Sequence, residues 1–240
     1  MPLSVAGNRK VKVAQCWDDG VVNDERLTQL LRMYNAKATF NLNPGLMLSE
    51  RQPSGWNVFG QEGSGHSCFG YRTGKLGLNE IKDIYGDFQV ASHGWRHESA
   101  GLIPDEDFLK SALDTRHFLE DLFQRDCPGY AWPSGFHTPE TCRLLKEAGF
   151  KYARTARTDE NTDDVLAYKD PMLLCPSCHH FDQNFFKKYQ AAKKTGVFYF
   201  WGHSYELMEY DKLWDQIEQK IRYISQDPDA EWVDVIDLIK

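Results

Sequence analysis

Hydrophobic and polar positions follow two alternating patterns along the chain. Short apolar runs, typical of buried strands, occur at 11–16, 38–41, 88–92, 130–132, 152–154 and 197–201. Between them, apolar residues three and four positions apart predict helices at 24–34, 78–85, 104–123, 138–148, 182–194 and 213–225. Residues 231–240 predict a last strand with a helical turn. This alternation predicts an α/β fold built on a mostly parallel sheet or barrel.

One long stretch interrupts the alternation. Residues 44–77 are rich in Gly and Ser and lack clear periodicity, which predicts an insertion or a lid. No repeat, low-complexity tract or block of like charges divides the 240 residues. We therefore expect a single domain over residues 1–240 that carries this insertion.

Composition and charge exclude several classes of protein. With 41% hydrophobic and 26% charged residues, the chain has the profile of a globular protein. A net charge of −7 argues against nucleic acid or anionic membrane as the main partner. No apolar run is long enough for membrane insertion, and the N-terminus lacks the apolar core of a signal peptide. We expect a cytoplasmic protein as the sequence stands, or an exported one whose signal was removed. The six scattered cysteines are expected to be reduced, and the sequence does not predict the oligomeric state.

The first predicted strand runs directly into two acidic residues in VAQCWDDG, residues 13–20. Asp18 and Asp19 followed by Gly20 would suit an ordinary turn. However, ligands of parallel α/β folds gather at the carboxyl ends of strands, where these carboxylates lie. Adjacent buried carboxylates require a cation or a proton. The pair therefore indicates either a turn or a site.

A second strand ends in SHGWRH, residues 92–97. One helical turn would direct the imidazoles of His93 and His97 to the same point. Alone, this spacing more often belongs to surface or packing histidines. Combined with an aspartate, however, two imidazoles form a three-ligand site with an open coordination position. Such a site is typical of a catalytic metal.

Two further strand ends carry candidate chemistry. FYFWGHS delivers His203, and YAWPSG at 130–135 runs into a Pro/Gly turn. Trp95, Trp132 and Trp201 lie beside these motifs and suit an apolar pocket or a platform for a sugar. Core packing is the alternative for each, and it is favoured for Trp201, which lies within a strand. Together the four strand ends predict one pocket.

These motifs resemble those of the polysaccharide deacetylases, the NodB-homology or carbohydrate esterase family 4 enzymes. The family's T-F-D-D-G motif is matched at 16–20, its H-S/T-x-x-H motif at 93–97 and its L-x-H motif at 201–203. The resemblance covers about residues 11–237. Within the family, the chain is more similar to members associated with gellan-lyase-like proteins than to chitin deacetylases.

The resemblance implies a fold, a reaction and roles for matching residues. The fold would be a distorted (β/α) barrel with seven rather than eight regular strands, forming one catalytic domain. Asp19, His93 and His97 would hold a divalent metal, expected to be zinc, although such sites also accept Co²⁺, Ni²⁺, Mn²⁺ or Fe²⁺. Asp18 would be the general base and His203 the general acid. The enzyme would remove N- or O-linked acetyl groups from a carbohydrate by means of a metal-activated water.

Two departures from the family pattern concern the groups around the general base. Ser134 matches the position whose backbone N–H stabilises the oxyanion, but Ala131 stands where the family has an arginine. Arg154 or Arg157 could supply that guanidinium from a neighbouring strand end. The Asp-rich fourth motif has no clean counterpart, and residues 152–164 lie where it would be expected.

A separate cluster, CPSCHH at 175–180, leaves its role open. Cys175 and Cys178 with neighbouring histidines can form half of a zinc site, but no second C-x-x-C completes it. We favour a loop near the pocket in which His179 or His180 touches substrate, and a solvated loop is an equal alternative.

Three functions agree with these observations. The first is a metal-dependent deacetylase of acetylated carbohydrate. The second is a hydrolase of the same fold that acts on a non-sugar amide or cyclic imide. The third is a catalytically impaired relative that binds carbohydrate, which the alanine in the third motif allows.

Overall fold

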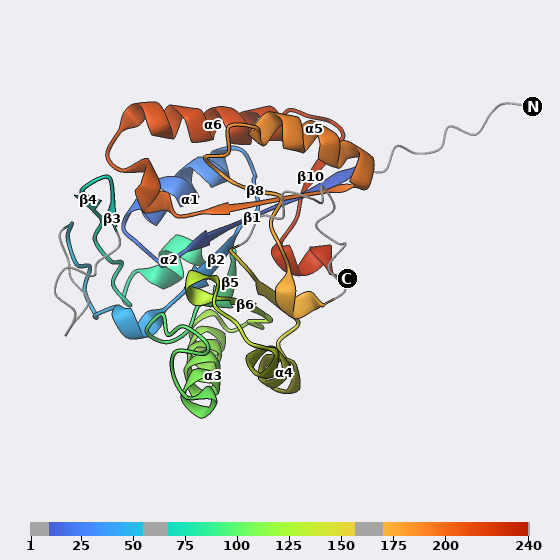
Figure 1. The fold of residues 1–240 in the computed structure, drawn as a ribbon. Coiled ribbons are helices and arrows are strands. Elements are labelled where there is room, and N and C mark those ends of the chain that lie inside the picture. Colours follow the sequence, from blue (N-terminus) through green and yellow to red (C-terminus); the bar gives the residue numbers. More distant parts are fainter. Residues whose placement is uncertain (1–9, 55–66, 157–169, 240) are drawn as a thin grey trace, which may run out of the picture.

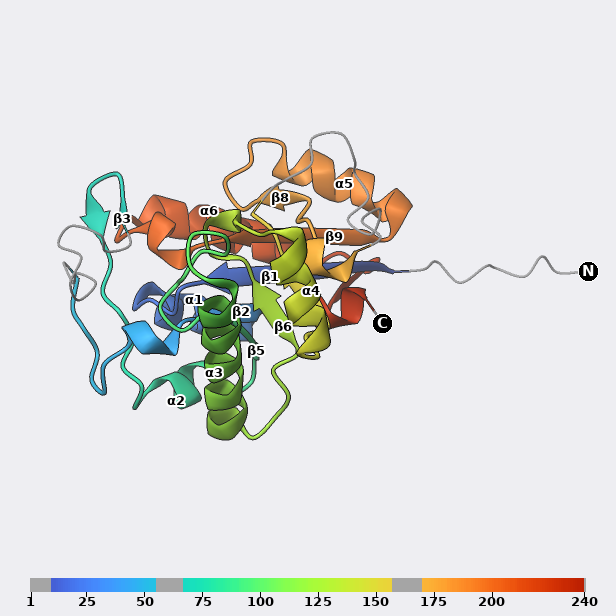
Figure 2. The same ribbon diagram turned by 60° about the horizontal axis from the view of Figure 1, so that its bottom comes forward.

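The computed structural model describes residues 10–54, 67–156 and 170–239. A curved sheet runs through the middle of the molecule, and helices cover its outer surface (Figure 1). α5 and α6 lie together on one side of the sheet, and α3 and α4 lie on the other (Figures 1 and 2). None of the helices in the described ranges is long and apolar enough to cross a membrane.

Seven parallel strands form the path of the sheet, in the order β7-β6-β5-β2-β1-β9-β8. Their bounds are β1 (Val11–Asp18), β2 (Thr39–Leu42), β5 (Gln89–Ser92), β6 (Gly129–Ala131), β7 (Tyr152–Arg154), β8 (Cys178–His179) and β9 (Val197–Gly202). A further strand, β10 (Ala230–Trp232), pairs with the start of β1. Leu174 bridges Arg154 at the edge of β7, so the chain leading to β8 partly closes the curve. The predicted seven-stranded distorted barrel is confirmed.

In the described ranges, six α-helices connect these strands or cover them. They are α1 (Asn23–Met33), α2 (Ile81–Tyr85), α3 (Asp105–Phe123), α4 (Pro139–Glu147), α5 (Phe185–Thr195) and α6 (Asp211–Ser225). α4 begins where the hydroxyl of Thr138 accepts a hydrogen bond from the N–H of Thr141, which caps the first turn. α6 buries residues three and four positions apart, namely Trp214, Ile217, Ile221 and Ile224. The periodicity in the sequence therefore located the helices because it marks their buried faces.

The sequence predictions differ from the structure at short elements. The helix expected over 78–85 begins only at Ile81, because residues 78–80 form a turn. β8 was not predicted, since two residues carry no periodic signal. At the C-terminus, β10 and the short 3-10 helix η6 (Val235–Leu238) account for the predicted strand and turn.

The predicted insertion at 44–77 includes residues 55–66, which lie outside the described residues. On one side of that gap, a short hairpin joins β3 (Ser67–Cys68) and β4 (Tyr71–Arg72). Residues 73–77 are buried. Within them, Lys75 pairs through its main chain with Gln52, and Leu76 donates its N–H to the carbonyl of Gly20. This segment therefore packs against the chain that follows β1.

The strand register brings the carboxyl ends of the strands to one edge. Asp18 at the end of β1 lies opposite Asn41 of β2, and Trp17 lies opposite Gly202 of β9. Ser92 at the end of β5 pairs with Tyr130 of β6. The motifs that follow β1, β5, β6 and β9 consequently meet at this edge of the barrel.

Candidate active site

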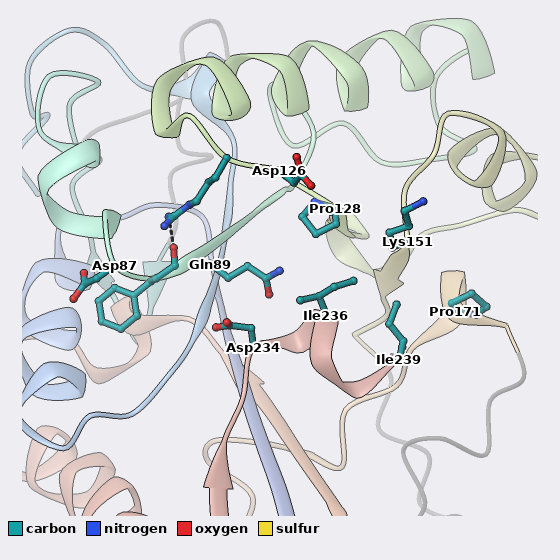
Figure 3. A pocket seen from close by; sticks show the side chains of 11 residues that line it. Asp87, Gln89, Asp126, Pro128, Lys151, Pro171, Asp234, Ile236 and Ile239 are labelled. Carbon is teal, nitrogen blue, oxygen red and sulfur yellow. Dashed lines mark hydrogen bonds between the residues drawn. The ribbon is translucent and has the colours of Figure 1, made fainter.

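Two cavities lie at opposite edges of the sheet. A cavity of about 730 Å³ lies at the amino-terminal edge, where Gln89 begins β5 and where Pro128 and Lys151 precede β6 and β7 (Figure 3). Its lining includes none of the described residues that the motifs single out. Active sites of parallel α/β folds lie at the opposite, carboxyl edge. The larger cavity is therefore not the candidate active site.

The candidate active site is a pocket of about 300 Å³ at the carboxyl edge. Its lining combines residues from the ends of five strands: Asp18, Asp19, His93, His97, Trp132, Ser134, Arg154, Ala156, Trp201, His203 and Tyr205. Eight of these were singled out from the sequence as site residues. They are Asp18, Asp19, His93, His97, Trp132, Ser134, Arg154 and His203. The structure thus brings together residues from Asp18 near the start of the chain to His203 near its end.

Asp19, His93 and His97 form a group able to hold a metal ion. One ligand atom from each lies within 4.8 Å of the others. Asp19 Oδ1 is 3.6 Å from His93 Nε2 and 3.9 Å from His97 Nε2. His93 Nδ1 is 2.9 Å from the carbonyl oxygen of Ala131. If this nitrogen carries the proton, the lone pair of Nε2 faces Asp19, as in histidine ligands whose other nitrogen donates to a carbonyl. A carboxylate and two imidazoles fit a divalent first-row cation.

The main chain around these ligands is not helical. His93 and His97 lie in a loop after β5, where Gly94 has a φ of 73° and His97 a φ of 61°. The predicted helical turn between the two histidines was therefore wrong. Two left-handed residues, rather than 3.6-residue periodicity, direct both rings toward Asp19, which itself has a φ of 84°.

Asp19 is supported from behind by an asparagine and a buried lysine. Asn43 Nδ2 lies 3.2 Å from Asp19 Oδ1 and donates to it. Lys75 Nζ donates to the main-chain carbonyl of Asp19 and to Asn43 Oδ1. Lys75 is 0% exposed, and its burial lowers the pKa of its ammonium to about 8 although Asp19 and Asp24 oppose that shift. Lys75 thereby fixes the orientation of the Asn43 amide that faces Asp19.

Asp18 is held separately from Asp19. Asn41 Nδ2 donates to Asp18 Oδ1 at 2.7 Å, and a guanidinium nitrogen of Arg154 donates to Oδ2. Burial alone would raise the pKa of Asp18, but the positive charge of Arg154, followed by His93 and His203, keeps that pKa below its usual value. Asp18 therefore stays ionised. The structure places Arg154 where it can take the part of the arginine missing at Ala131.

His203 faces both aspartates on one side and Glu206 on the other. Its Nε2 lies 3.9 Å from Asp18 Oδ2 and from Asp19 Oδ2, and its Nδ1 lies 3.3 Å from Glu206 Oε1. The His203 N–H donates to Glu206 Oε2 at 2.9 Å. Burial opposes protonation of His203, but Glu206 and the two aspartates raise its pKa to about 9. The imidazole thus lies between carboxylates on both sides, with an ion-pair contact rather than a hydrogen bond between Nδ1 and Glu206, and favours its protonated form.

Glu206 also holds the two histidines of the CPSCHH cluster. Its Oε2 lies 3.1 Å from His179 Nε2 and 2.9 Å from His180 Nε2, and these three residues could in principle hold a second metal ion. However, the buried Nδ1 of His180 has no hydrogen-bond partner. If His180 bound a metal through Nε2, its proton would be on Nδ1, where it would be buried without an acceptor. If Nε2 instead donates its proton to Glu206, Nδ1 carries only a lone pair, which costs less when buried. We therefore interpret this cluster as hydrogen-bonded.

The cysteines of the same cluster do not complete a zinc site. Cys175 and Cys178 are buried, and none of the six cysteines forms a disulfide in the described structure. Cys175 Sγ contacts the hydroxyl of Thr155, and Cys178 belongs to the main hydrophobic core. Neither belongs to a metal-holding group within the described residues. The half zinc site considered from the sequence is thus not formed in this part of the chain.

Of the three tryptophans singled out from the sequence, two line the pocket and one does not. Trp132 lines the pocket while its Nε1 donates to the carbonyl of Met172 at 2.8 Å. Trp201 packs against a small core cluster, as the sequence favoured, but it also lines the pocket. The Arg154 guanidinium lies 4.7 Å from its ring centroid. Core packing is therefore only part of the role of Trp201. Trp95 does not line the pocket and instead packs on Phe118.

Ser134, His179 and Arg157 were also predicted to stabilise the oxyanion, bind substrate or support the base. Ser134 lines the pocket in the 3-10 turn η2 (Pro133–Gly135), with a φ of 54°. His179 is not among the pocket-lining residues and contacts Glu206 behind them. Arg157 lies outside the described residues.

Sequence reasoning missed several residues that support the site. They are Asn41, Asn43, Lys75, Tyr205 and Glu206. Two polar residues at the end of a buried strand, in TFNLNP, were a signal for the asparagines. The spacing of Glu206, three positions after His203 in a short turn, was a signal for that pair. No local pattern marks Lys75, because only the tertiary fold brings it to Asp19.

Comparison with known proteins agrees with this geometry. The sequence profile of the family "Polysaccharide deacetylase" matches residues 6–153, which is more than half of the chain. No curated protein matches the chain significantly. A proposed polysaccharide deacetylase from Mycobacterium smegmatis has a similar fold, with a TM-score of 0.66 and 15% identity over 99% of this chain and 93% of that one.

Two further solved structures share the fold. A family 4 acetyl xylan esterase from Clostridium thermocellum, in complex with a cobalt ion, gives a TM-score of 0.53 and 14% identity over 95% of this chain and 89% of that one. A peptidoglycan N-acetylglucosamine deacetylase gives a TM-score of 0.57 and 14% identity over 97% and 89%. The match to the family profile, with the fold and the Asp/His group described above, establishes that the chain belongs to the polysaccharide deacetylase family.

Proposed function

We propose that this protein is a metal-dependent deacetylase that removes acetyl groups from a carbohydrate. The observation that carries the proposal is the convergence, in one pocket, of a three-ligand group with a second aspartate, Asp18, and a third histidine, His203. Asp19, His93 and His97 would hold the cation, and Asp18 and His203 remain for proton transfer. Metal-assisted hydrolysis needs this division of roles.

A divalent cation at this group would supply Lewis acidity, which lowers the pKa of a coordinated water toward about 7 and polarises the acetyl carbonyl. We propose zinc, because one carboxylate and two imidazoles suit it, although the same donors accept other first-row ions. Asp18 accepts the proton of the attacking water, because Arg154 and Asn41 keep it ionised and oriented. Such general-base assistance typically contributes about 10²–10⁴-fold in rate.

His203 protonates the departing oxygen or nitrogen of the sugar. The Glu206 carboxylate lies 3.3 Å from its Nδ1 and favours the imidazolium, and its Nε2 faces the pocket in which Asp18 and Asp19 lie. The backbone N–H of Ser134 would stabilise the developing oxyanion, a role worth about 10²–10³-fold in acyl transfer. The aromatic walls provided by Trp132, Trp201 and Tyr205 suit an acetyl methyl group.

The substrate class is proposed from the family and the pocket together. The fold relatives include an esterase of acetyl xylan and a deacetylase of N-acetylglucosamine, so both O-linked and N-linked acetyl groups are candidate substrates. The gellan-lyase-associated subgroup stays a prediction from the sequence. The contact of Arg154 with Asp18 weighs against a catalytically impaired relative, because the base keeps a guanidinium partner despite Ala131.

The proposal is tested by measuring acetate release with and without metal. The protein is stripped with a chelator, reloaded with Zn²⁺ or Co²⁺, and incubated with an N-acetylglucosamine pentamer, with acetylated xylo-oligosaccharides and with small cyclic imides. Metal-dependent acetate release from at least one oligosaccharide is expected. Ring opening of imides without acetate release would instead establish the non-sugar hydrolase. Binding of oligosaccharide without turnover by the metal-loaded protein would establish the impaired relative, and either result contradicts the proposal.

A further inference from the structure

The hairpin between β3 and β4 presents an aromatic residue in an unfavourable backbone conformation. Phe69 and Gly70 form its two-residue turn, with φ values of 46° and 82°. Two-residue hairpin turns with two positive φ values strongly prefer Asn-Gly, and a bulky side chain at the first position is costly. The Phe69 side chain is also 94% exposed, so it gains no packing energy from the hairpin. Neither local stability nor burial explains a phenylalanine here.

Half of the other described non-glycine residues with a positive φ line the candidate active site. Seven non-glycine residues among those described have a positive φ. Asn35 and Gln124 follow the ends of α1 and α3, where left-handed residues are common. The remaining residues are Asp19, Phe69, His97, Ser134 and Met208. Three of these line the catalytic pocket, and unfavourable conformations of this kind persist where function requires them.

The hairpin lies beside the segment that carries His203. β3 packs against the 3-10 helix η5 (Ser204–Leu207), which follows His203 and contains the pocket residue Tyr205. Burial raises the pKa of the Cys68 thiol, and the negative charge of Glu206 adds to that shift, so Cys68 lies close to Glu206. Tyr71 fixes the other strand, since its hydroxyl is 3.0 Å from Glu209 Oε1. The turn is therefore anchored beside the segment that supplies Tyr205 to the pocket wall, and its Phe69 side chain faces solvent.

We propose that Phe69 is a stacking platform for a sugar ring of the substrate chain, next to the acetylated sugar that enters the pocket. This inference rests on the proposed function. The C–H face of a pyranose is apolar and covers an aromatic ring well, which removes both apolar surfaces from water. An exposed ring on a hairpin that packs beside the pocket wall suits a polymer whose neighbouring sugars extend beyond a pocket of about 300 Å³. Binding of the chain thus compensates for the strain in the turn.

The substitution Phe69→Asn separates this role from a structural one. Asn-Gly is the preferred sequence for the turn, so the variant should be more stable, with a Tm about 2 °C higher. Loss of the platform should lower kcat/KM for the N-acetylglucosamine pentamer about tenfold, through KM. Hydrolysis of para-nitrophenyl acetate, which does not reach the hairpin, should be unchanged. Phe69→Trp should retain the low KM.

Phe186→Ala is the matched control. Phe186 is also exposed, but it lies on α5, away from the hairpin, and packs on Tyr223 (Figures 1 and 2). This variant should keep the wild-type KM. An unchanged KM in Phe69→Asn, or an equal loss with the small ester, would overturn the platform. Calorimetric titration with the pentamer distinguishes the two proposals: if wild type binds it more tightly than Phe69→Asn but releases no acetate, the platform stands and the proposed reaction fails.

Discussion

Arg154 and Asp18 meet across the interior of the barrel. Arg154 ends β7 and Asp18 ends β1, and three strands separate β7 from β1 in the sheet order. Both side chains are buried, and a guanidinium nitrogen donates to Asp18 Oδ2. The family's usual arginine would come from the position of Ala131 on β6, so a neighbouring strand supplies the same group here. The curvature of the sheet makes this substitution possible.

Replacing Arg154 with methionine should abolish most of the activity. The change leaves Asp18 as a buried charge without its cation, which typically costs about 3–5 kcal/mol of unfolding free energy. Because Asp18 then favours protonation, kcat should fall by about 10²-fold or more. Steady-state kinetics and thermal unfolding measure the two effects. Arg116→Met, which removes a partly exposed ion pair with Glu120, is the control and should have little effect on kcat. Full kcat in Arg154→Met would show that Asp18 needs no guanidinium.

Glu206→Gln should reduce turnover without loss of metal. The glutamine keeps an oxygen near His203 but removes the negative charge that favours the imidazolium. We expect kcat to fall about 10–100-fold while KM and the metal content stay near wild type. Glu209→Gln, in which the carboxylate faces Tyr71 instead, should leave kcat unchanged. Equal losses in both variants would place the effect in the fold rather than on His203.

Lys75→Met should weaken metal binding. The change leaves the Asp19 carbonyl and Asn43 Oδ1 without their donor, so the Asp19 carboxylate loses its fixed orientation. Loss of such support typically costs about 10–100-fold in metal affinity. Competition with a chelator measures the affinity, and the absorption spectrum of bound Co²⁺ reports the geometry.

Two further variants make the Lys75 result specific. Lys12 lies at the start of β1, the strand that ends just before Asp19, and donates to the main-chain carbonyl of Asp237 at 2.6 Å, so Lys12→Met removes a similar bond far from the pocket. It should keep the wild-type affinity. Asn43→Leu retains Lys75 but removes the donor to Asp19 Oδ1, and should weaken metal binding as well. Wild-type affinity in both Lys75→Met and Asn43→Leu would exclude the supporting role.

The sequence predicted those parts of the site that follow directly from strand ends. DDG, SHGWRH and WGH each end a parallel strand, so their convergence follows from topology alone. The conformation of the histidine pair could not be predicted, because it depends on positive φ values at Gly94 and His97. The support by Lys75 could not be predicted either, since it depends on tertiary packing of a segment without periodicity. β8 was too short to leave a pattern.

Asp24 should make stability fall as the pH rises toward neutrality. It is fully buried, and burial raises its pKa from 3.8 to about 7, although hydrogen bonds from Ser204 and Tyr85, each 2.5 Å long, oppose the shift. Between about pH 4 and pH 7 the folded protein therefore holds a proton that the unfolded chain has released. This contribution to stability is complete below about pH 4 and is lost as the pH rises through 7.

Asp24→Asn removes this titration and should flatten the dependence of Tm on pH over the same range. Thermal unfolding of both proteins from about pH 4 to pH 8 measures the difference. The Tm of the variant relative to wild type should rise with pH. A constant difference across the range would mean that Asp24 is already ionised in the folded protein at pH 4.

The most direct test of the proposed reaction compares metal content and acetate release in Asp18→Asn and His97→Ala. Asp18 is the proposed general base and does not belong to the metal-holding group, whereas His97 does. We expect Asp18→Asn to keep its cation and lose turnover, and His97→Ala to lose both. Full acetate release by Asp18→Asn, or a full complement of metal in His97→Ala, would contradict this expectation.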